Sequence, residues 1–136
     1  MPNLKILVVD DDAVVRSLCE IILKRQKFHP ILAADGIEGL ERFKEFRNDI
    51  ALVLSDIKMP GMDGIAMVKQ MLELKPRSKV ILMSGFSPDY PSSGGDLSKV
   101  CLFIQKPFAP GQIISAVEKC LGVKDKNERM GSSRNT

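Results

Sequence analysis

The stretch LKILVVDDD, from Leu4 to Asp12, joins an aliphatic run directly to three consecutive aspartates. A continuous apolar run of strand length is typical of a strand that is buried on both faces of a sheet. The three aspartates mark the end of this strand. Asp12 is then placed to cap the start of a helix. The stretch therefore predicts a buried strand, an acidic turn and a helix, in that order.

Further apolar runs of strand length alternate with segments of helical period along the chain. The expected strands are Leu4–Val9, Pro30–Ala33, Ala51–Ser55, Val80–Met83 and Leu102–Gln105. The expected helices are one after Asp12, Gly36–Phe46, Gly64–Leu74 and Gly111–Leu121. In the first helix the apolar residues recur at spacings of three and four, namely Val14, Val15, Leu18, Ile21 and Ile22. This alternation predicts an α/β fold with helices on both faces of a five-stranded parallel sheet.

The segment between the fourth and fifth strands breaks the alternation. Residues 87–99, SPDYPSSGGDLSK, contain two prolines and two glycines and offer almost no apolar face. A glycine inside a helix costs about 1 kcal/mol relative to alanine, and proline is tolerated only in the first turn. We therefore expect a weak or missing fourth helix, with residues 88–99 the least ordered part of the domain.

Length and composition favour one domain and exclude several classes of protein. The 136 residues fit a single core, which we assign to residues 1–122, followed by a polar tail or truncated linker at 123–136. The 20 Lys and Arg residues are interspersed with 17 Asp and Glu, and there is no Trp and one Tyr, which argues against nucleic-acid binding. An apolar run of about 20 residues, as a membrane span needs, does not occur. We expect a cytoplasmic protein without membrane insertion.

The cysteines and the single histidine predict neither a metal site nor a disulfide. Cys19, Cys101 and Cys120 are odd in number, far apart and without a C-x-x-C pair, so we expect reduced, mostly buried thiols. His29 has no Cys or acidic neighbour and is interpreted as a partly buried structural residue. Zinc hydrolysis and histidine-based nucleophilic triads are therefore disfavoured.

Polar side chains follow the ends of four predicted strands. They are Asp10 and Asp11, Asp56, Ser84 and Lys106. The carboxyl ends of parallel strands share one edge of the sheet, so these side chains should converge. Two carboxylates about 4 Å apart repel by about 4 kcal/mol at an effective dielectric constant of 20, so the cluster requires cations. Hard oxygen ligands without Cys or His favour Mg²⁺, with Lys106 supplying further positive charge.

A carboxylate beside Mg²⁺ can act as a nucleophile toward phosphorus and form an aspartyl phosphate. Asp56 is the better candidate because it stands alone on its strand, whereas Asp10 and Asp11 form a natural cation clamp. Each motif also has a purely structural interpretation. The three aspartates could be a solvated turn with a helix cap, and DIKMPGMDG at 56–64 could be a loop that leads into a helix. Their joint placement at successive strand ends favours the chemical interpretation.

Four motifs together resemble the receiver domain of two-component response regulators, over about residues 3–122. They are ILVVDDD at 6–12 with Arg16, SDIKMPGMDG at 55–64, MSG at 83–85 and KPF at 106–108. The resemblance implies a doubly wound, flavodoxin-like sheet with strand order 2-1-3-4-5. It also implies a phosphorylation-controlled signalling switch, which is not an enzyme beyond assisting its own phosphorylation and dephosphorylation.

The resemblance further implies roles for individual residues. Asp56 would be the phosphoacceptor and Lys106 would contact the phosphoryl group, with a cis peptide bond to Pro107. Mg²⁺ would be held by Asp11, by Asp10 largely through water, by Asp56 and by the backbone carbonyl of Lys58. Ser84 and Phe103 would be the switch residues. Lys58 and Phe86 would set the lifetime of the phosphoryl group, which should be long because Phe cannot accept a proton from water.

The implied donor is a sensor histidine kinase or a phosphotransfer protein, and the implied target is a downstream effector protein. A receiver excised from a hybrid histidine kinase or a larger regulator is an alternative, because no effector domain follows Gly122 in the sequence. A haloacid-dehalogenase-like phosphatase with an Asp nucleophile is disfavoured, since that family needs an acid where Lys58 stands. A degenerate receiver that only binds partners is disfavoured by the complete set of acidic, hydroxyl and lysine residues.

Overall fold

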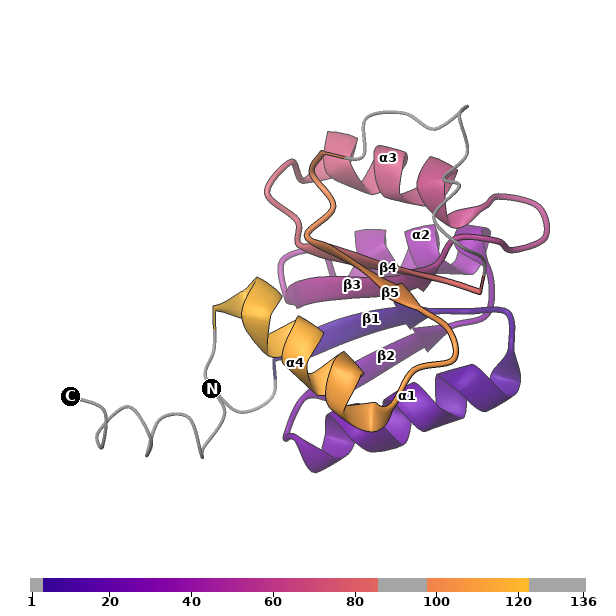
Figure 1. Ribbon diagram of the computed structural model, residues 1–136. Coiled ribbons are helices and arrows are strands. Elements are labelled where there is room, and N and C mark those ends of the chain that lie inside the picture. The colour runs from indigo at the N-terminus through magenta and orange to yellow at the C-terminus, as the bar shows by residue number, and fades with distance from the viewer. Residues whose placement is uncertain (1–3, 86–97, 123–136) are drawn as a thin grey trace.

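Five strands and four helices alternate in the computed structural model, which describes residues 4–85 and 98–122 (Figure 1). The strands are β1 (Lys5–Val9), β2 (His29–Ala33), β3 (Ile50–Asp56), β4 (Val80–Ser84) and β5 (Leu102–Gln105). The helices are α1 (Ala13–Arg25), α2 (Gly36–Glu45), α3 (Gly64–Leu74) and α4 (Pro110–Leu121). Every element expected from periodicity within this part of the chain is present, with bounds that differ by at most one residue.

The strands form one parallel sheet in the order β2-β1-β3-β4-β5, which confirms the predicted topology. The strand register brings the carboxyl ends of the four strands β1, β3, β4 and β5 to one edge. The pairs at that edge are Val9 with Ser55, Asp56 with Met83, and Ser84 with Gln105. The sheet therefore delivers the residues that follow these strands to a common place.

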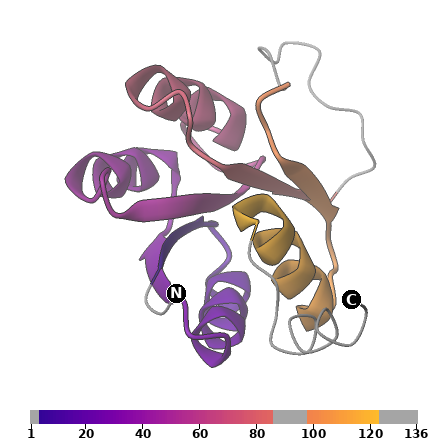
Figure 2. The same cartoon turned by 90° about the vertical axis from the view of Figure 1, so that its left-hand side faces the viewer.

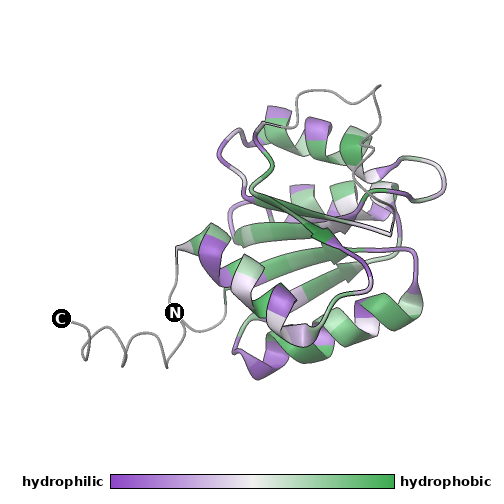
Figure 3. Ribbon diagram, in the orientation of Figure 1, coloured by the Kyte–Doolittle hydropathy of each residue, from purple (hydrophilic) through white to green (hydrophobic). Residues whose placement is uncertain are grey.

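Helices cover both faces of the sheet (Figure 2), and a hydrophobic core lies on each face. Successive strand residues point to opposite faces, so Ile6 and Val8 pack toward α1 and α4, whereas Leu7 and Val9 pack toward α2 and α3. All four of these side chains are fully buried, and Figure 3 shows the sheet as almost continuously hydrophobic. Burial on both faces is the reason why the strands lack the alternation of a half-exposed sheet.

Helix α1 buries a different face from the one that its apolar residues predict. Cys19, Ile22 and Leu23 lie in the core, whereas Val14, Leu18 and Ile21 are 74%, 38% and 51% exposed. The exposed residues are themselves spaced by four and three, so they form a second apolar stripe along the helix. Periodicity alone cannot decide which of two such stripes faces the sheet.

The cysteine prediction is wrong for one pair. Cys101 and Cys120 form a disulfide with a Cα–Cα distance of 6.1 Å, while Cys19 is free and buried. Cys101 precedes β5, and α4 runs back along the sheet after β5, so its last turn returns Cys120 to the strand's beginning. Sequence spacing gave no sign of this approach. His29 is also exposed rather than partly buried, as the first residue of the edge strand β2.

Several expectations fall on residues that lie outside the described part of the chain. They are the weak fourth helix and low order of residues 88–99, the role of Phe86, and the polar tail at 123–136. Of residues 88–99 only Ser98 and Lys99 are described, and they form a turn. Among the helices of the described residues, none is long and apolar enough to cross a membrane.

The start of α3 is packed against the end of β3. Asp63 caps the helix by accepting a hydrogen bond from the amide of Ala66 at 2.8 Å, and the amide of Gly64 donates to the carbonyl of Ile57 at 2.7 Å. A Cβ atom on Gly64 would collide with the backbone carbonyl oxygen of Asp56. Glycine is therefore required here by close backbone approach, and α3 supports the strand end that carries Asp56.

The substitution Gly64→Ala is expected to lower the free energy of unfolding by about 1–3 kcal/mol, because either α3 or the Asp56 backbone must shift. Gly111→Ala is the matched control, since nothing lies within 4 Å of the Cβ that it adds in α4. Alanine should make this control equally stable or more stable by about 0.5–1 kcal/mol. Urea denaturation measures both, and a Gly64→Ala protein as stable as the wild type would contradict the close approach.

Candidate acidic site at the sheet edge

Three carboxylates meet at the carboxyl edge of the sheet. Asp10 and Asp11 follow β1, and Asp56 is the last residue of the neighbouring strand β3. One carboxylate oxygen from each lies within 4.8 Å of the others. Asp10 is fully buried, Asp56 is 7% exposed, and Asp11 is exposed. The site is thus partly open to solvent at Asp11, whereas the carboxylate of Asp10 is its most buried charge.

Lys106 joins the two buried carboxylates. Its Nζ lies 2.8 Å from Oδ2 of Asp10 and 3.3 Å from Oδ2 of Asp56. Its backbone amide donates to the carbonyl of Ser84 at 2.7 Å, which ties the end of β5 to the end of β4. The peptide bond from Lys106 to Pro107 is cis, which confirms the prediction.

Backbone and side-chain hydrogen bonds hold the carboxylates in place. The Oδ1 of Asp10 accepts from the amide of Asp12 at 2.9 Å, and the Oδ1 of Asp56 accepts from the amide of Ile57 at 2.9 Å. Nη1 of Arg16 donates to the backbone carbonyl of Asp10 at 2.6 Å. Arg16 belongs to the first motif but received no role in the sequence interpretation. Its place in the first turns of the helix after the acidic turn is the signal that could have revealed one.

Burial and neighbouring charge shift the proton affinities of the site. Burial, and next the charge of Asp10, raise the pKa of Asp56 above its ordinary value of 3.8, although Lys106 opposes the shift. Burial by itself would lower the pKa of Lys106, but the hydrogen bond and charge of Asp10 and the charge of Asp56 outweigh it and raise that pKa. Lys106 therefore remains an ammonium group, while the ionised form of Asp56 is disfavoured.

The other predicted residues lie around this cluster at different distances from its centre. Ser84 ends β4 at the same sheet edge and is partly buried. Lys58 is exposed in the loop between β3 and α3. Phe103 lies on β5 and packs with the α2 and α3 side of the core. The sheet thus brings together Asp10, Asp11, Asp56 and Lys106, and it places Ser84 on their edge.

The donor set fits a magnesium ion. All three carboxylates are hard oxygen donors, and the cluster that they form within the described residues includes no His or Cys. When the three acids are ionised, Lys106 balances one of the three negative charges and two remain. A divalent cation supplies that missing charge, and the exposed side of Asp11 leaves room for water ligands.

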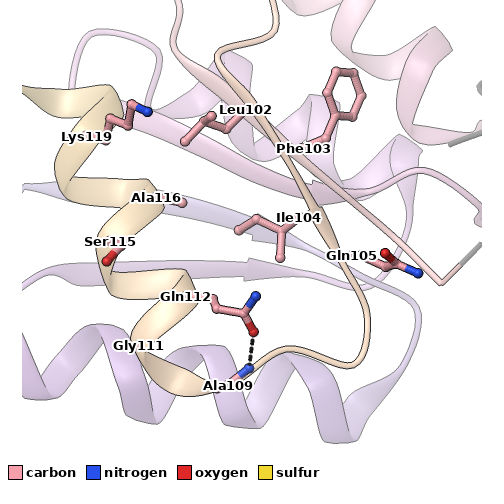
Figure 4. A pocket seen from close by; sticks show the side chains of 10 residues that line it. All are labelled: Leu102, Phe103, Ile104, Gln105, Ala109, Gly111, Gln112, Ser115, Ala116 and Lys119. Atoms are coloured by element: carbon pink, nitrogen blue, oxygen red, sulfur yellow. Dashed lines mark hydrogen bonds between the residues drawn. The ribbon is translucent and has the colours of Figure 1, made fainter. Parts of the chain in front are cut away.

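A separate groove of about 670 Å³ lies between β5 and α4, away from the carboxylates (Figure 4). Leu102 and Ile104 point toward α4, whereas Phe103 points to the opposite side of the strand. At one end the side chain of Gln112 accepts a hydrogen bond from the amide of Ala109 at 2.7 Å and closes the first turn of α4. The groove contains none of the acidic residues.

The fold and this acidic edge are those of a receiver domain, and the comparison with known families agrees. The model of the response regulator receiver domain matches residues 6–118. The chain belongs to this family, and it is therefore a receiver domain of the two-component signalling type. Receiver domains bind Mg²⁺ at an acidic pocket and interact with histidine kinases or phosphotransfer proteins and with effectors.

Individual relatives show the same likeness over nearly their whole length. The chain is 35% identical to sporulation initiation phosphotransferase F of Bacillus subtilis over 91% of this chain and 98% of that protein. It is 31% identical to the chemotaxis protein CheY of Thermotoga maritima, over 85% and 95%. The structure resembles a CheX–CheY–BeF₃–Mg²⁺ complex from Borrelia burgdorferi with a TM-score of 0.81 and 27% identity, over 90% and 92%.

Because the pKa of Asp56 is raised, we expect the folding stability of the metal-free protein to depend on pH. The folded protein holds the Asp56 proton more tightly than the unfolded chain, whose pKa is near 3.8. Stability is therefore lost as the pH rises from 3.8 through the raised pKa, and it stays lower above it. The substitution Asp56→Asn removes this cost, so its melting temperature should exceed that of the wild type increasingly over that pH range.

Thermal melts at a series of pH values, with a chelator present, measure this difference. Asp49→Asn is the matched control, because Asp49 is exposed and lies away from the cluster, so its melting curves should follow the wild type. A wild-type protein that is as stable as Asp56→Asn at neutral pH would contradict the assignment of an electrostatic cost to Asp56.

Proposed function

We propose that this chain is a phosphorylation-controlled signalling switch that accepts a phosphoryl group on Asp56 from a phosphohistidine of a sensor kinase or phosphotransfer protein. The observation that carries the proposal is the position of the Asp56 carboxylate. Asp56 ends a central strand, and its carboxylate lies 3.3 Å from the ammonium of Lys106 and within 4.8 Å of carboxylate oxygens of Asp10 and Asp11. This arrangement suits a carboxylate nucleophile that faces a highly charged phosphoryl donor.

In the proposed transfer an oxygen of Asp56 attacks phosphorus while the bond from phosphorus to the donor imidazole breaks. The imidazole nitrogen leaves with the electron pair and takes up a proton. The Nζ of Lys106, 2.8 Å from Asp10 and 3.3 Å from Asp56, would move its hydrogen bonds from these carboxylates to the phosphoryl oxygens. Mg²⁺, held by Asp10, Asp11, Asp56 and the Lys58 carbonyl, would neutralise charge on the transferred group.

The signal would leave the site through Ser84 and Phe103. Ser84 stands at the end of β4 on the same edge as Asp56, so its hydroxyl is the group that we expect to bond the phosphoryl oxygen. Phe103 lies on the adjacent strand β5, two residues from the Gln105 that pairs with Ser84. A shift at Ser84 would thus reach the surface of β5, where a downstream effector protein could detect it.

The remaining predictions concern turnover, the lifetime of the phosphoryl group and the cellular location. The protein would assist only its own phosphorylation and dephosphorylation and would not turn over a substrate. Lys58 and Phe86 would give a long-lived aspartyl phosphate, Phe86 being outside the described residues. The cytoplasmic location and the lack of direct nucleic-acid binding remain predictions from composition.

The exposed stripe of α1 offers a docking surface for the phosphoryl donor. Val14, Leu18 and Ile21 are 74%, 38% and 51% exposed, although all three are apolar. The helix that carries them begins at Ala13, with Asp12 as its N-cap, directly after Asp10 and Asp11. Contiguous exposed apolar residues with polar surroundings mark protein interaction sites. A donor bound along this stripe would hold its histidine near Asp56.

Acetyl phosphate should add one phosphoryl group to the protein in the presence of Mg²⁺. Excess chelator should slow labelling at least about 100-fold, because the uncompensated carboxylates then repel the anionic donor. Intact-mass analysis measures the added group, and borohydride reduction followed by peptide mapping locates it. Asp56→Asn should remain unlabelled, while Asp49→Asn should label like the wild type. Equal labelling of Asp56→Asn would refute the assignment.

A second test compares a protein donor, which must dock on the α1 stripe, with acetyl phosphate, which need not. Leu18→Glu should slow phosphoryl transfer from a histidine-phosphorylated kinase or phosphotransfer protein at least about tenfold, because it places a charge in the interface. Labelling by acetyl phosphate should remain within about twofold of the wild type, because that donor needs no docking surface. Leu74→Glu is the control, since Leu74 is 39% exposed on α3, on the opposite face of the sheet. Parallel loss with both donors would exclude a docking role for the stripe.

A further inference from the structure

We propose that Cys101 and Cys120 form a reversible crosslink that responds to the redox state of low-molecular-weight thiols and holds α4 against β5. The two residues are 19 positions apart in the sequence, and their sulfurs are bonded in the structure. Neither belongs to the acidic site. The inference concerns a second site on the domain and does not depend on phosphorylation.

The two cysteines differ in solvent exposure, and this difference determines which of them reacts first. Cys101 is exposed in the segment before β5, where its amide donates to the carbonyl of Val80 at 2.7 Å. Cys120 is 4% exposed in the last turn of α4. A reagent from solution therefore meets Cys101, while Cys120 is protected until Cys101 brings a reactive sulfur to it. Cys19 lies in the core with no exposed surface and takes no part.

The proposed reagent is a small disulfide such as oxidised glutathione. The Cys101 thiolate attacks one sulfur of the reagent, its S–S bond breaks, and one glutathione thiolate leaves. The Cys120 thiolate then attacks the Cys101 sulfur, forms the internal disulfide and releases the second glutathione thiolate. The two cysteines lose two electrons, which reduce the reagent, and the two protons pass to the released thiolates. Excess reduced glutathione reverses both steps.

The surrounding structure favours a reversible bond over a purely structural one. Small domains that depend on disulfides have poor cores, whereas this domain has a packed core on each face of its sheet. In a reducing compartment, such as the cytoplasm predicted from the composition, disulfides are transient or redox-sensing. Cys101 is also an exposed residue, and cysteine reactivity rises with exposure. Each of these features points to a bond that forms and breaks during the life of the folded protein.

The crosslink lies at one end of the groove between β5 and α4. Leu102 and Lys119 line that groove, and they are the direct chain neighbours of the two cysteines (Figure 4). Oxidation therefore limits how far the end of α4 can move from the start of β5. The same strand leads to Lys106 four residues beyond Leu102, so the crosslink anchors the opposite end of an element that reaches the acidic edge.

The experiment equilibrates the full chain with defined mixtures of reduced and oxidised glutathione, blocks free thiols with iodoacetamide in denaturant and measures intact mass. The reduced protein should take up three labels, one for each cysteine, and the oxidised protein one, on Cys19. Peptide mapping should show Cys101 joined to Cys120. Cys101→Ser should take up two labels under all conditions, whereas Cys19→Ala should still form the crosslink.

The effect on structure is measured on the same two forms. The oxidised form should melt at least about 5 °C above the reduced form, because the crosslink restricts the unfolded chain. Hydrogen exchange should be slower in the last turn of α4. The Cys101→Ser protein should show neither difference. Any one of the following labelling results would overturn the proposal: three labels at every redox ratio, a mixed disulfide with glutathione that is never replaced by the internal bond, or pairing with Cys19. A bond that excess reduced glutathione leaves intact would also overturn it. So would equal melting temperatures and equal hydrogen exchange of the two forms.

Discussion

Repulsion among three carboxylates at one edge of the sheet is the constraint on which this structure depends. Asp10, Asp11 and Asp56 meet there because parallel strands end together, and Lys106 offsets only part of their charge. Burial raises this repulsion, since charges interact more strongly away from water. The site therefore stores an electrostatic cost in the absence of a cation. A divalent cation would relieve that cost, and the proposed transfer of a phosphoryl group to Asp56 would act on the same charges.

The domain tolerates this cost because the rest of the sheet is well packed. Both faces of β1 and β3 are buried, and the helix α3 begins against the backbone of Asp56 at Gly64. The hydrogen bond from Arg16 to the Asp10 carbonyl fixes the acidic turn to the first helix. These contacts leave the carboxylates little freedom to move apart. The two hydrophobic cores thus stabilise the fold, while the carboxylates at the sheet edge remain close together at a cost in stability.

The sequence predicted the sheet and its acidic edge because both depend on short-range patterns. Continuous apolar runs mark doubly buried strands, and polar residues directly after them must lie at the strand ends, as Asp56 and Lys106 do. The strand order came only from the family resemblance. The pairing of Cys101 with Cys120 depends on how α4 returns beside β5, which no local spacing encodes. The exposed stripe of α1 was missed because its periodicity equals that of the buried stripe.

The two outer strands of the sheet have a consequence for how the domain meets other molecules. Strand β2 at one margin contains Pro30, which cannot donate a backbone hydrogen bond. Strand β5 at the other margin has only four residues, and Pro107 follows two positions after it. Short or proline-containing margins resist extension of the sheet by a foreign strand. Both margins of the sheet therefore disfavour edge-to-edge aggregation of the domain.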